Sequence, residues 1–531
     1  MLKQTEVVNN SSGSGGTDSP TIERFTSGGD GGNGGAIYLS GGELHVYDAF
    51  FQSNRTGRGA SAFGSGGNGG NGGAIRANGS TIEIVRTTFQ ENASGSGASS
   101  FVSGNGGRGG ALWLSGGTTR LTRVRLLSNQ TGSGGEGGFD DNTGGDGGDG
   151  AWIGTRSLHV NESTFSNNRT GDGRGPGDLN GGNGGTGGGL FFSGTSLHVV
   201  ASTFSDNLTG NGGNTNDIMG TGGEGGSGGG LYASGTVTSG RIESSTFSRN
   251  TTGSGGDGGG PPAEDGQSGH GGALFLGSSL LIRSSTIVGN HVSERASGVP
   301  TLASGGGLHT ATTARLNSTL IVGNTNGPDA DDCSTGILGQ YLLTSTGTGC
   351  TTDAPGTRFV VPEDLFTIVL DPLRDNGGPT LTHALLPGSP AIDSGTCALG
   401  TTDQRGLPRP VDVIGTPNAT NGCDIGAVES QTGTVIPDTE PDPAPPMGLA
   451  LTVAPNPAQG PASVTLRTEA DALVTVEVLD VRGRRLRVLH RGAAPSGGDL
   501  VLSAGGLPVG VYLIRATTEA GAVTTRLTVV R

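Results

Sequence analysis

The chain is short of the residues from which an ordinary globular core is built. Only 31% of its 531 residues are hydrophobic and 4% are aromatic, whereas a typical soluble domain has roughly 45–50% apolar residues. No apolar run approaches the ~18 residues of a membrane-spanning helix. Any core must therefore be assembled from small apolar contributions that recur along the chain.

Positive charge is scarce as well. The chain has 31 basic and 46 acidic residues, a formal net charge of −15, and Lys3 is its one lysine. Non-specific binding to nucleic acid or to an anionic membrane needs a basic face, so the composition argues against both kinds of partner. The opening residues, MLKQTEVVNNSSGSGG, also lack the apolar segment of a signal peptide.

Cysteine is absent until late in the chain, where Cys333, Cys350, Cys397 and Cys423 occur without C-x-x-C metal spacing. Four cysteines allow three pairings. Two local disulfides, Cys333–Cys350 and Cys397–Cys423, are the simplest interpretation, and they would imply an oxidising compartment.

Glycine is abundant, with 109 residues, and it makes long helices improbable because each Gly costs a helix about 1 kcal/mol relative to Ala. Its distribution follows an internal repeat. A Gly-rich step ends on an apolar or aromatic residue, and 13 to 16 residues later an apolar residue is followed by x-x-Asn. The steps end at Ile37, Ile75, Leu112, Trp152, Leu190, Leu231, Leu274 and Leu308, and the asparagines are Asn54, Asn92, Asn129, Asn168, Asn207, Asn250, Asn290 and Asn324.

In each repeat, the residues between the Gly-rich step and the asparagine alternate between apolar and polar, as in Leu44-His45-Val46. This alternation predicts short strands with one buried face. Such strands must stack on one another to bury that face. We therefore expect an all-β chain, a right-handed parallel β-helix with eight copies of about 38 residues over 31–330, after a partial segment at 1–30. Stacked copies would place the asparagines in a buried ladder whose amides bond along the column.

The signature Gly-Gly-Ala-Ile … Phe-x-x-Asn resembles the repeats of polymorphic outer-membrane proteins and pectin-lyase-like β-helices. In those families a coil takes about 20–25 residues, which leaves Gly-rich inserts such as GSGGNGGNGG at 64–73. A protruding loop is favoured because the inserts have few apolar residues. A second, nearly all-Gly coil is an alternative, and so are threefold extended helices with Gly at their contacts.

The segment 331–430 contains DPLRDNGGPTLTHALLPGSPAIDSG, DQRGLPRP and DIGAVE in order, and it resembles the choice-of-anchor Q region of bacterial surface proteins. That resemblance supports the Cys333–Cys350 pair and implies no catalytic residue. Residues 431–449, rich in Pro and acids, are expected to form an extended linker.

Residues 450–531 alternate as short strands and predict a small β-sandwich. They resemble the type A sorting domain of the type IX secretion system, which implies this machinery as a partner and a secreted, cell-surface location. Because such cargo carries a signal peptide, we expect a truncated gene product. The landmarks are Pro455, Asn456, Pro457, Asp480, Gly483, Arg484, Gly510, Tyr512 and Arg531.

Candidate chemistry is sparse. His45, His159 and His198 share a repeat position that alternation turns outward, so surface histidines are favoured over a metal site. Loosely bound Ca²⁺ at Asp/Gly stretches such as 139–146 and 144–150 is an alternative to solvated turns, and no other cofactor is expected. The asparagine ladder accounts for most Asn-x-Ser/Thr sequons. The acids of the coils are scattered: Asp48, Glu83, Glu91, Glu162, Asp206 and Glu243.

These features favour a secreted surface adhesin or glycan-binding protein. Two alternatives stay open. One is a polysaccharide lyase or glycoside hydrolase, which would need carboxylates ~5–10 Å apart or a base beside a neutralising group. The other is a structural surface-layer component.

Overall fold

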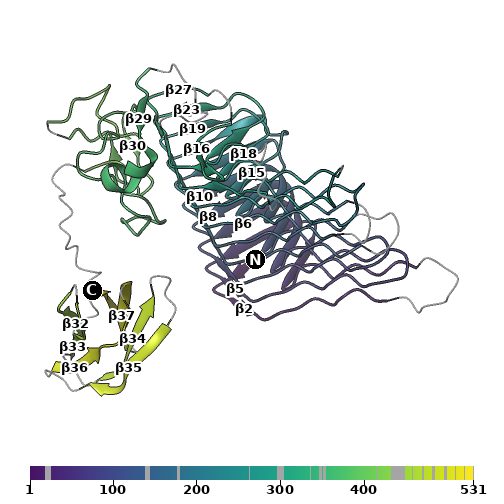
Figure 1. Ribbon diagram of the computed structural model, residues 1–531, viewed down its shortest axis with the longest axis horizontal. Coiled ribbons are helices and arrows are strands. Elements are labelled where there is room, and N and C mark those ends of the chain that lie inside the picture. Colours follow the sequence, from purple (N-terminus) through teal and green to yellow (C-terminus); the bar gives the residue numbers. More distant parts are fainter. Residues whose placement is uncertain are drawn as a thin grey trace. The chain divides into compact units, whose positions relative to one another are not determined.

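The computed structural model describes residues 1–17, 26–137, 144–175, 180–261, 263–295, 304–334, 337–345, 350, 355–413, 415–431, 449–456, 458–468, 472–480, 485–494, 499–508, 510–518 and 521–529. The chain divides into two units, Met1–Thr432 and Gly433–Arg531, and each is described by itself. Unit 1 is a parallel β-solenoid from which long inserts project (Figure 1). Among the described residues, no helix is long and apolar enough to cross a membrane.

Two parallel sheets form the solenoid, and each repeat contributes to both of them. In the described part of the chain, sheet 1 consists of β1 (Leu2–Lys3), β3 (Ile37–Ser40), β4 (Glu43–Tyr47), β6 (Ile75–Val85), β8 (Leu112–Thr122), β10 (Ala151–Asn161), β12 (Leu190–Phe192), β13 (Ser196–Val200), β15 (Leu231–Ala233), β16 (Ser239–Glu243), β18 (Leu274–Leu276), β19 (Leu281–Arg283), β22 (Leu308–Thr310), β23 (Arg315–Asn317) and β27 (Leu338–Gln340). Sheet 2 consists of β2 (Glu6–Val8), β5 (Phe50–Gln52), β7 (Thr88–Gln90), β9 (Arg125–Leu127), β11 (Thr164–Ser166), β14 (Thr203–Ser205), β17 (Thr246–Ser248), β20 (Thr286–Val288), β24 (Leu320–Val322), β28 (Leu343–Ser345) and β29 (Arg358–Val360).

The register places like residues above one another. Phe165 of β11 pairs with Phe204 of β14, and their buried rings stack with centroids 4.5 Å apart. The expected β-helix is thus confirmed, although one step was assigned wrongly. Ala151, and not Trp152, pairs with Leu190 and turns inward, because strand alternation sends Trp152 to the outer face.

A column of buried asparagines joins the two sheets to the inserts. In each described pair of neighbours, the Nδ2 of one asparagine donates a hydrogen bond to the Oδ1 of the next. For example, Asn168 Nδ2 lies 2.9 Å from Asn207 Oδ1. Asn207 Nδ2 also donates to the carbonyl of Phe165. The column ends at Asp332, which accepts from Asn324 Nδ2 at 2.8 Å. Every member of the column therefore has its amide satisfied without water.

The inserts leave the solenoid as paired extended arms that stack from repeat to repeat, and we call this stack the glycine slab. Its interior is a chain of backbone hydrogen bonds between successive arms, such as Gly70 N–H to Gly57 O and Gly107 N–H to Gly95 O. The bonded residue recurs every third position, which is the period of the polyproline-II conformation. The arms are residues 11–16 and 28–35, 55–60 and 64–73, 93–98 and 102–110, 130–137 and 144–150, 169–175 and 180–189, 208–215 and 221–230, and 251–259 and 264–272.

Glycine is required in the slab because the arms approach too closely for a side chain. A Cβ added at Gly57, Gly95 or Gly132 would overlap the carbonyl of the neighbouring arm. After Asn54, Asn92, Asn129, Asn168 and Asn207, the hydroxyl of the second following residue links the slab to the solenoid. Thr170 Oγ1, for example, donates to Gly185 O and accepts from Gly210 N–H. This pairing gives a structural reason for these five Asn-x-Thr/Ser sequons.

The remainder of unit 1 includes a lateral segment, residues 371–431, that packs on the outer face of sheet 2. His383 Nε2 lies 3.0 Å from Ser248 Oγ, and Gln404 Nε2 donates to Thr203 Oγ1. The disulfides are Cys333–Cys350 and Cys397–Cys423. Other short elements of this unit are β21 (His291–Val292), β25 (Thr325–Asn326), β26 (Asp329–Ala330), η1 (Pro362–Asp364), η2 (Leu365–Val369), β30 (Thr401–Thr402) and β31 (Pro408–Arg409).

Unit 2 consists of two antiparallel sheets that share one apolar core. Val464 and Leu466 of one sheet and Val476 and Ile514 of the other are fully buried in it. The first sheet holds β32 (Leu449–Ala454), β33 (Ala462–Thr468) and β36 (Asp499–Ala504), and the second holds β34 (Ala472–Asp480), β35 (Arg485–Ala494), β37 (Gly510–Thr518) and β38 (Gly521–Val529).

Candidate functional site

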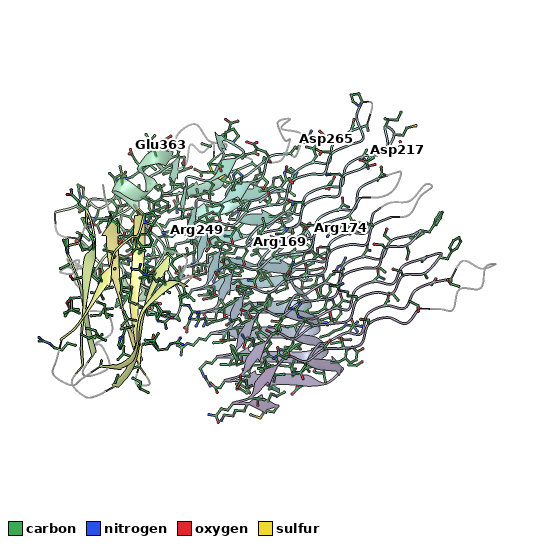
Figure 2. The ribbon with its side chains drawn as sticks, turned by 60° about the horizontal axis from the view of Figure 1, so that its bottom comes forward. Arg169, Arg174, Asp217, Arg249, Asp265 and Glu363 are labelled. Carbon is green, nitrogen blue, oxygen red and sulfur yellow. A yellow bond between two sulfur atoms is a disulfide. The ribbon has the colours of Figure 1, made fainter. Side chains whose placement is uncertain are left out.

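An open groove runs across successive returning arms of the glycine slab and encloses about 730 Å³. Its floor is glycine backbone, including Gly144, Gly182 and Gly222, all buried. Its sides are polar side chains one arm apart, and Figure 2 shows one of them, Asp265, far out along the arms. The polar lining residues are Ser103, Asn105, Asp146, Asn180, Asn183, Thr221, Glu224, Glu264, Asp265 and Gln267.

One side of the groove is a ladder of exposed carboxamides and carboxylates. The backbone N–H of Asp146 donates to Asn105 Oδ1, that of Asn183 to Asp146 Oδ1, and that of Glu224 to Asn183 Oδ1, at 2.7–2.8 Å. The side chains of Asn105, Asp146 and Asn183 are therefore each held in place by a hydrogen bond to one oxygen, Oδ1. The other polar atoms of these exposed side chains are the amide NH₂ groups of Asn105 and Asn183 and the second carboxylate oxygen of Asp146.

A second row stands three residues earlier on the arms, one polyproline-II turn or about 9 Å away. Here the N–H and Oγ1 of Thr221 both donate to Asn180 Oδ1. Successive arms repeat at about the 4.8 Å spacing of the strands to which they connect. The groove therefore presents a polar side chain at each of these arms, alternating between carboxamide and carboxylate along Asn105, Asp146, Asn183 and Glu224.

The charge of the groove limits what it can hold. Asp146, Glu224 and Glu264 line it, and no arginine or lysine stands among its lining residues in the described part of the chain. This lining repels a polyanion. It suits a neutral chain rich in hydroxyl groups, because hydroxyls both donate to carboxylates and accept from amides.

Sequence reasoning missed this site. The signal was present as a polar residue at every third position of the Gly-Gly-x inserts, but its alignment between repeats becomes visible only when the arms stack. Asn68, Asn105 and Asp146 occupy equivalent places although the repeats differ in length.

The outer face of sheet 1 carries an aromatic ladder that does not make a sugar-binding platform. Trp113 stacks on Trp152 at 4.7 Å, and Tyr232 stacks on Phe275 at 4.5 Å, with nearly parallel planes. Because each ring face is covered by the next ring, only ring edges face outward. The ladder therefore stabilises the stack, as the internal phenylalanines do.

The scattered acids of the coils are bound by neighbouring side chains, most of them in ion pairs with an arginine. Asp206 pairs with Arg249, Glu162 with Arg123, and Asp48 with Arg86. Glu243 pairs with Arg241 and Arg283, and Glu91 accepts from Gln52 and Gln90. These contacts bring no two of the acids together over a cleft, which is what glycan hydrolysis would need.

On the outer face of sheet 1, a titratable cluster forms around His45. Its Nδ1 lies 3.2 Å from Glu83 and its Nε2 lies 3.3 Å from Glu43, and Tyr47 donates to Glu83. The hydrogen bonds to Glu83 and Glu43 raise the pKa of His45, and those from Tyr47 and His45 lower the pKa of Glu83. The cluster lies on open surface and its groups satisfy one another, so we assign it no catalytic role.

His159 and His198 lie elsewhere on sheet 1, with their rings stacked at 4.9 Å. Among the described residues, no three His, Cys, Asp or Glu side chains gather as metal ligands. Asp146 and Asp149 of the 144–150 stretch bond to the next arm instead. The residues at 138–143, which the Ca²⁺ hypothesis also used, lie outside the described residues.

The chain's C-terminal unit matches a known family. Residues 452–530 match the secretion system C-terminal sorting domain. The sorting domain marks the protein as cargo of the type IX secretion machinery, secreted and attached at the cell surface. The comparison with curated proteins gave no match.

Several predicted landmarks of the sorting domain can be placed. Asn456, next to Pro455, accepts from the N–H of Thr528, and the hydroxyl of buried Tyr512, two residues after Gly510, donates to Pro508 O. Asp480 ends β34, but its side chain is not described. The other landmarks, Pro457, Gly483, Arg484 and Arg531, lie outside the described residues.

Proposed function

We propose that this secreted surface protein is a glycan-binding adhesin, and that the groove of the glycine slab holds a neutral polysaccharide along the stacking direction. The observation that carries the proposal is the groove itself. It combines a floor without side chains, fixed polar rows that repeat at every arm, and an acidic lining.

The physical argument rests on preorganisation. Asn105, Asn180 and Asn183 each accept a hydrogen bond from a backbone N–H, so little rotamer entropy is lost when a ligand binds to these side chains. The buried glycines allow a chain to approach the backbone closely. Repetition then multiplies weak contacts along one polymer, as multivalent binding requires.

The test is co-sedimentation of the full chain with insoluble cellulose and xylan, and affinity electrophoresis in dextran and laminarin, each with an assay for new reducing ends. Retention by at least one neutral polymer without new ends is the expected result. New ends or unsaturated products would instead establish a lyase or hydrolase, and no binding to any neutral polymer would remove the groove's assignment.

Two finer family assignments belong to the same proposal. The pectin-lyase-like character of the repeats and the choice-of-anchor Q character of residues 331–430 are supported by motif order in the sequence. The lateral segment of the latter region buries an Arg409–Glu429 ion pair and packs on sheet 2, which is consistent with a structural and non-catalytic role.

A further inference from the structure

A row of basic side chains lies on sheet 1 in a protein that is otherwise strongly acidic. Arg120, His159, His198 and Arg241 occupy one outward position on β8, β10, β13 and β16, paired rung to rung. Successive rungs are about 4.8 Å apart. The row therefore extends over three rung spacings with no acid at its own position.

A row of hydroxyls runs beside it, two residues earlier on the same strands. Thr118, Ser157, Ser196 and Ser239 are paired in the same register. Ser157 Oγ lies 3.2 Å from His159 Nε2. Cationic donors flanked by hydroxyl donors are the chemistry that binds sulfate, phosphate and carboxylate oxygens.

The charges around this row are accounted for. Glu243 is bound by Arg241 and Arg283, and Glu162 by Arg123. Glu83, one rung below Arg120, is bound by His45 and Tyr47. In the described part of the chain, Arg120 has no ion-pair partner, and it is exposed.

The side chains of His159 and His198 lie next to each other in this row and are partly buried. Their rings are parallel and half-buried, and the Nδ1 of His198 is buried without a partner among the described residues. Burial first, and then neighbouring charges, lower the pKa of both rings. An oxyanion placed on the row would offset the repulsion of His159 by Arg120 and of both rings by Arg241, and would favour the protonated forms of the rings.

We propose that Arg120, His159 and His198, with the hydroxyl row beside them, form a second binding strip on sheet 1 for a polysaccharide that carries sulfate or carboxylate groups. This strip goes beyond the neutral-glycan groove and does not depend on it. An extended polymer is favoured over a small free anion because the strip is open and repeats at every rung.

The experiment measures binding of the full chain to dextran sulfate, to polygalacturonate and to uncharged dextran at pH 5.5 and pH 8.0. R120Q, the double variant H159Q/H198Q, and R125Q are compared with the wild type. R125Q removes one exposed positive charge from sheet 2, so it is the matched control for R120Q. Thermal melting checks that each variant is folded.

We expect at least tenfold tighter binding of an anionic polymer at pH 5.5 than at pH 8.0, and loss of that pH dependence in H159Q/H198Q. R120Q should weaken binding about tenfold at both pH values, and R125Q should leave it unchanged. Preference for dextran sulfate or polygalacturonate would identify sulfate or carboxylate as the ligand group. Equal losses in R120Q and R125Q, or no anionic binding at either pH, would overturn the proposal.

Discussion

At the scale of single residues, the column asparagines and the slab glycines stabilise the protein through contacts between stacked repeats. Asn207 makes hydrogen bonds to the repeats on both sides, and Gly95 leaves room for a neighbouring carbonyl. Their energetic value arises only when the next repeat is in place.

Replacing Asn207 by Ala should lower the free energy of unfolding of unit 1 by at least about 2 kcal/mol, because the buried N–H of Asn168 loses its acceptor and Asn168 Nδ2, Asn250 Oδ1 and Phe165 O each lose one hydrogen bond. Chemical denaturation followed by circular dichroism would measure this. Asn161→Ala, at a half-buried outward position on β10, is the control. Equal midpoints for both variants would disprove the energetic role of the column.

Replacing Gly95 by Ala should cost about 1–3 kcal/mol through overpacking, since the new Cβ would overlap Gly57 O. Ser96→Ala, the next residue on the same arm, should be close to neutral. The melting temperatures of the two variants test this prediction, and that of Gly95→Ala should be the lower. A slab that tolerates Gly95→Ala as well as Ser96→Ala would not be packed as described.

At the scale of elements, the inserts and the lateral segment show where sequence reasoning was limited. The strands were predictable because apolar residues five positions before each Phe, such as Val160 and Val199, mark the buried face. The glycine arms carry almost no side-chain pattern, so three arrangements stayed open. The structure shows one rung per sheet in each repeat, with the insert packed as threefold extended arms.

The sequence did not predict where the lateral segment packs on the solenoid. Gln404 and Thr203 are 201 residues apart in sequence, and their contact depends on the solenoid being complete. Motif order alone says nothing of which sheet such a segment covers.

The buried carboxyl groups of this segment predict a pH effect. Burial, with Glu429 nearby, raises the pKa of Asp424 to about 7 from its usual 3.8. A raised carboxyl pKa contributes stability that is complete below about pH 4 and is lost as the pH rises to about 7. His383, whose pKa burial lowers to about 4, acts in the opposite direction as the pH falls.

Asp424→Asn should therefore reduce the loss of unit 1 stability between pH 5 and pH 7.5, while the exposed Asp412→Asn should not. Denaturant midpoints at the two pH values would measure the difference between each variant and the wild type. An unchanged pH dependence in Asp424→Asn would show that this carboxyl is ionised in the folded protein at both pH values.

At the scale of the whole molecule, the two units have different roles. Unit 2 contains the secretion sorting domain, and unit 1 contains the glycine slab and its groove. The sequence was sufficient for the fold class and for the sorting domain, since both rest on repeated or ordered motifs. It was insufficient for the groove, because residues such as Asn105 and Asn183 become neighbours only through the stacking of repeats.

Removal of residues 450–531 should leave the protein in the periplasm, because the sorting domain is the part read by the secretion machinery. Surface proteolysis of intact cells and immunoblotting of periplasmic fractions would check this, with R125Q as a full-length control. Normal surface display of the shortened chain would contradict the assignment.

The central claim, that the groove binds a neutral glycan, is tested most directly by two matched substitutions. Asn183→Asp keeps the oxygen that accepts from Glu224 but removes the amide donors in the groove. Asn211→Asp makes the same change at an exposed asparagine that also follows an Asp in its ladder, outside the groove lining.

Affinity of both full-length variants for the neutral polymer that retains the wild type would be measured by affinity electrophoresis. We predict about tenfold weaker binding for Asn183→Asp, the equivalent of about 1.4 kcal/mol, and wild-type binding for Asn211→Asp. Equal affinity of the two variants would contradict the account and place the binding surface elsewhere on the molecule.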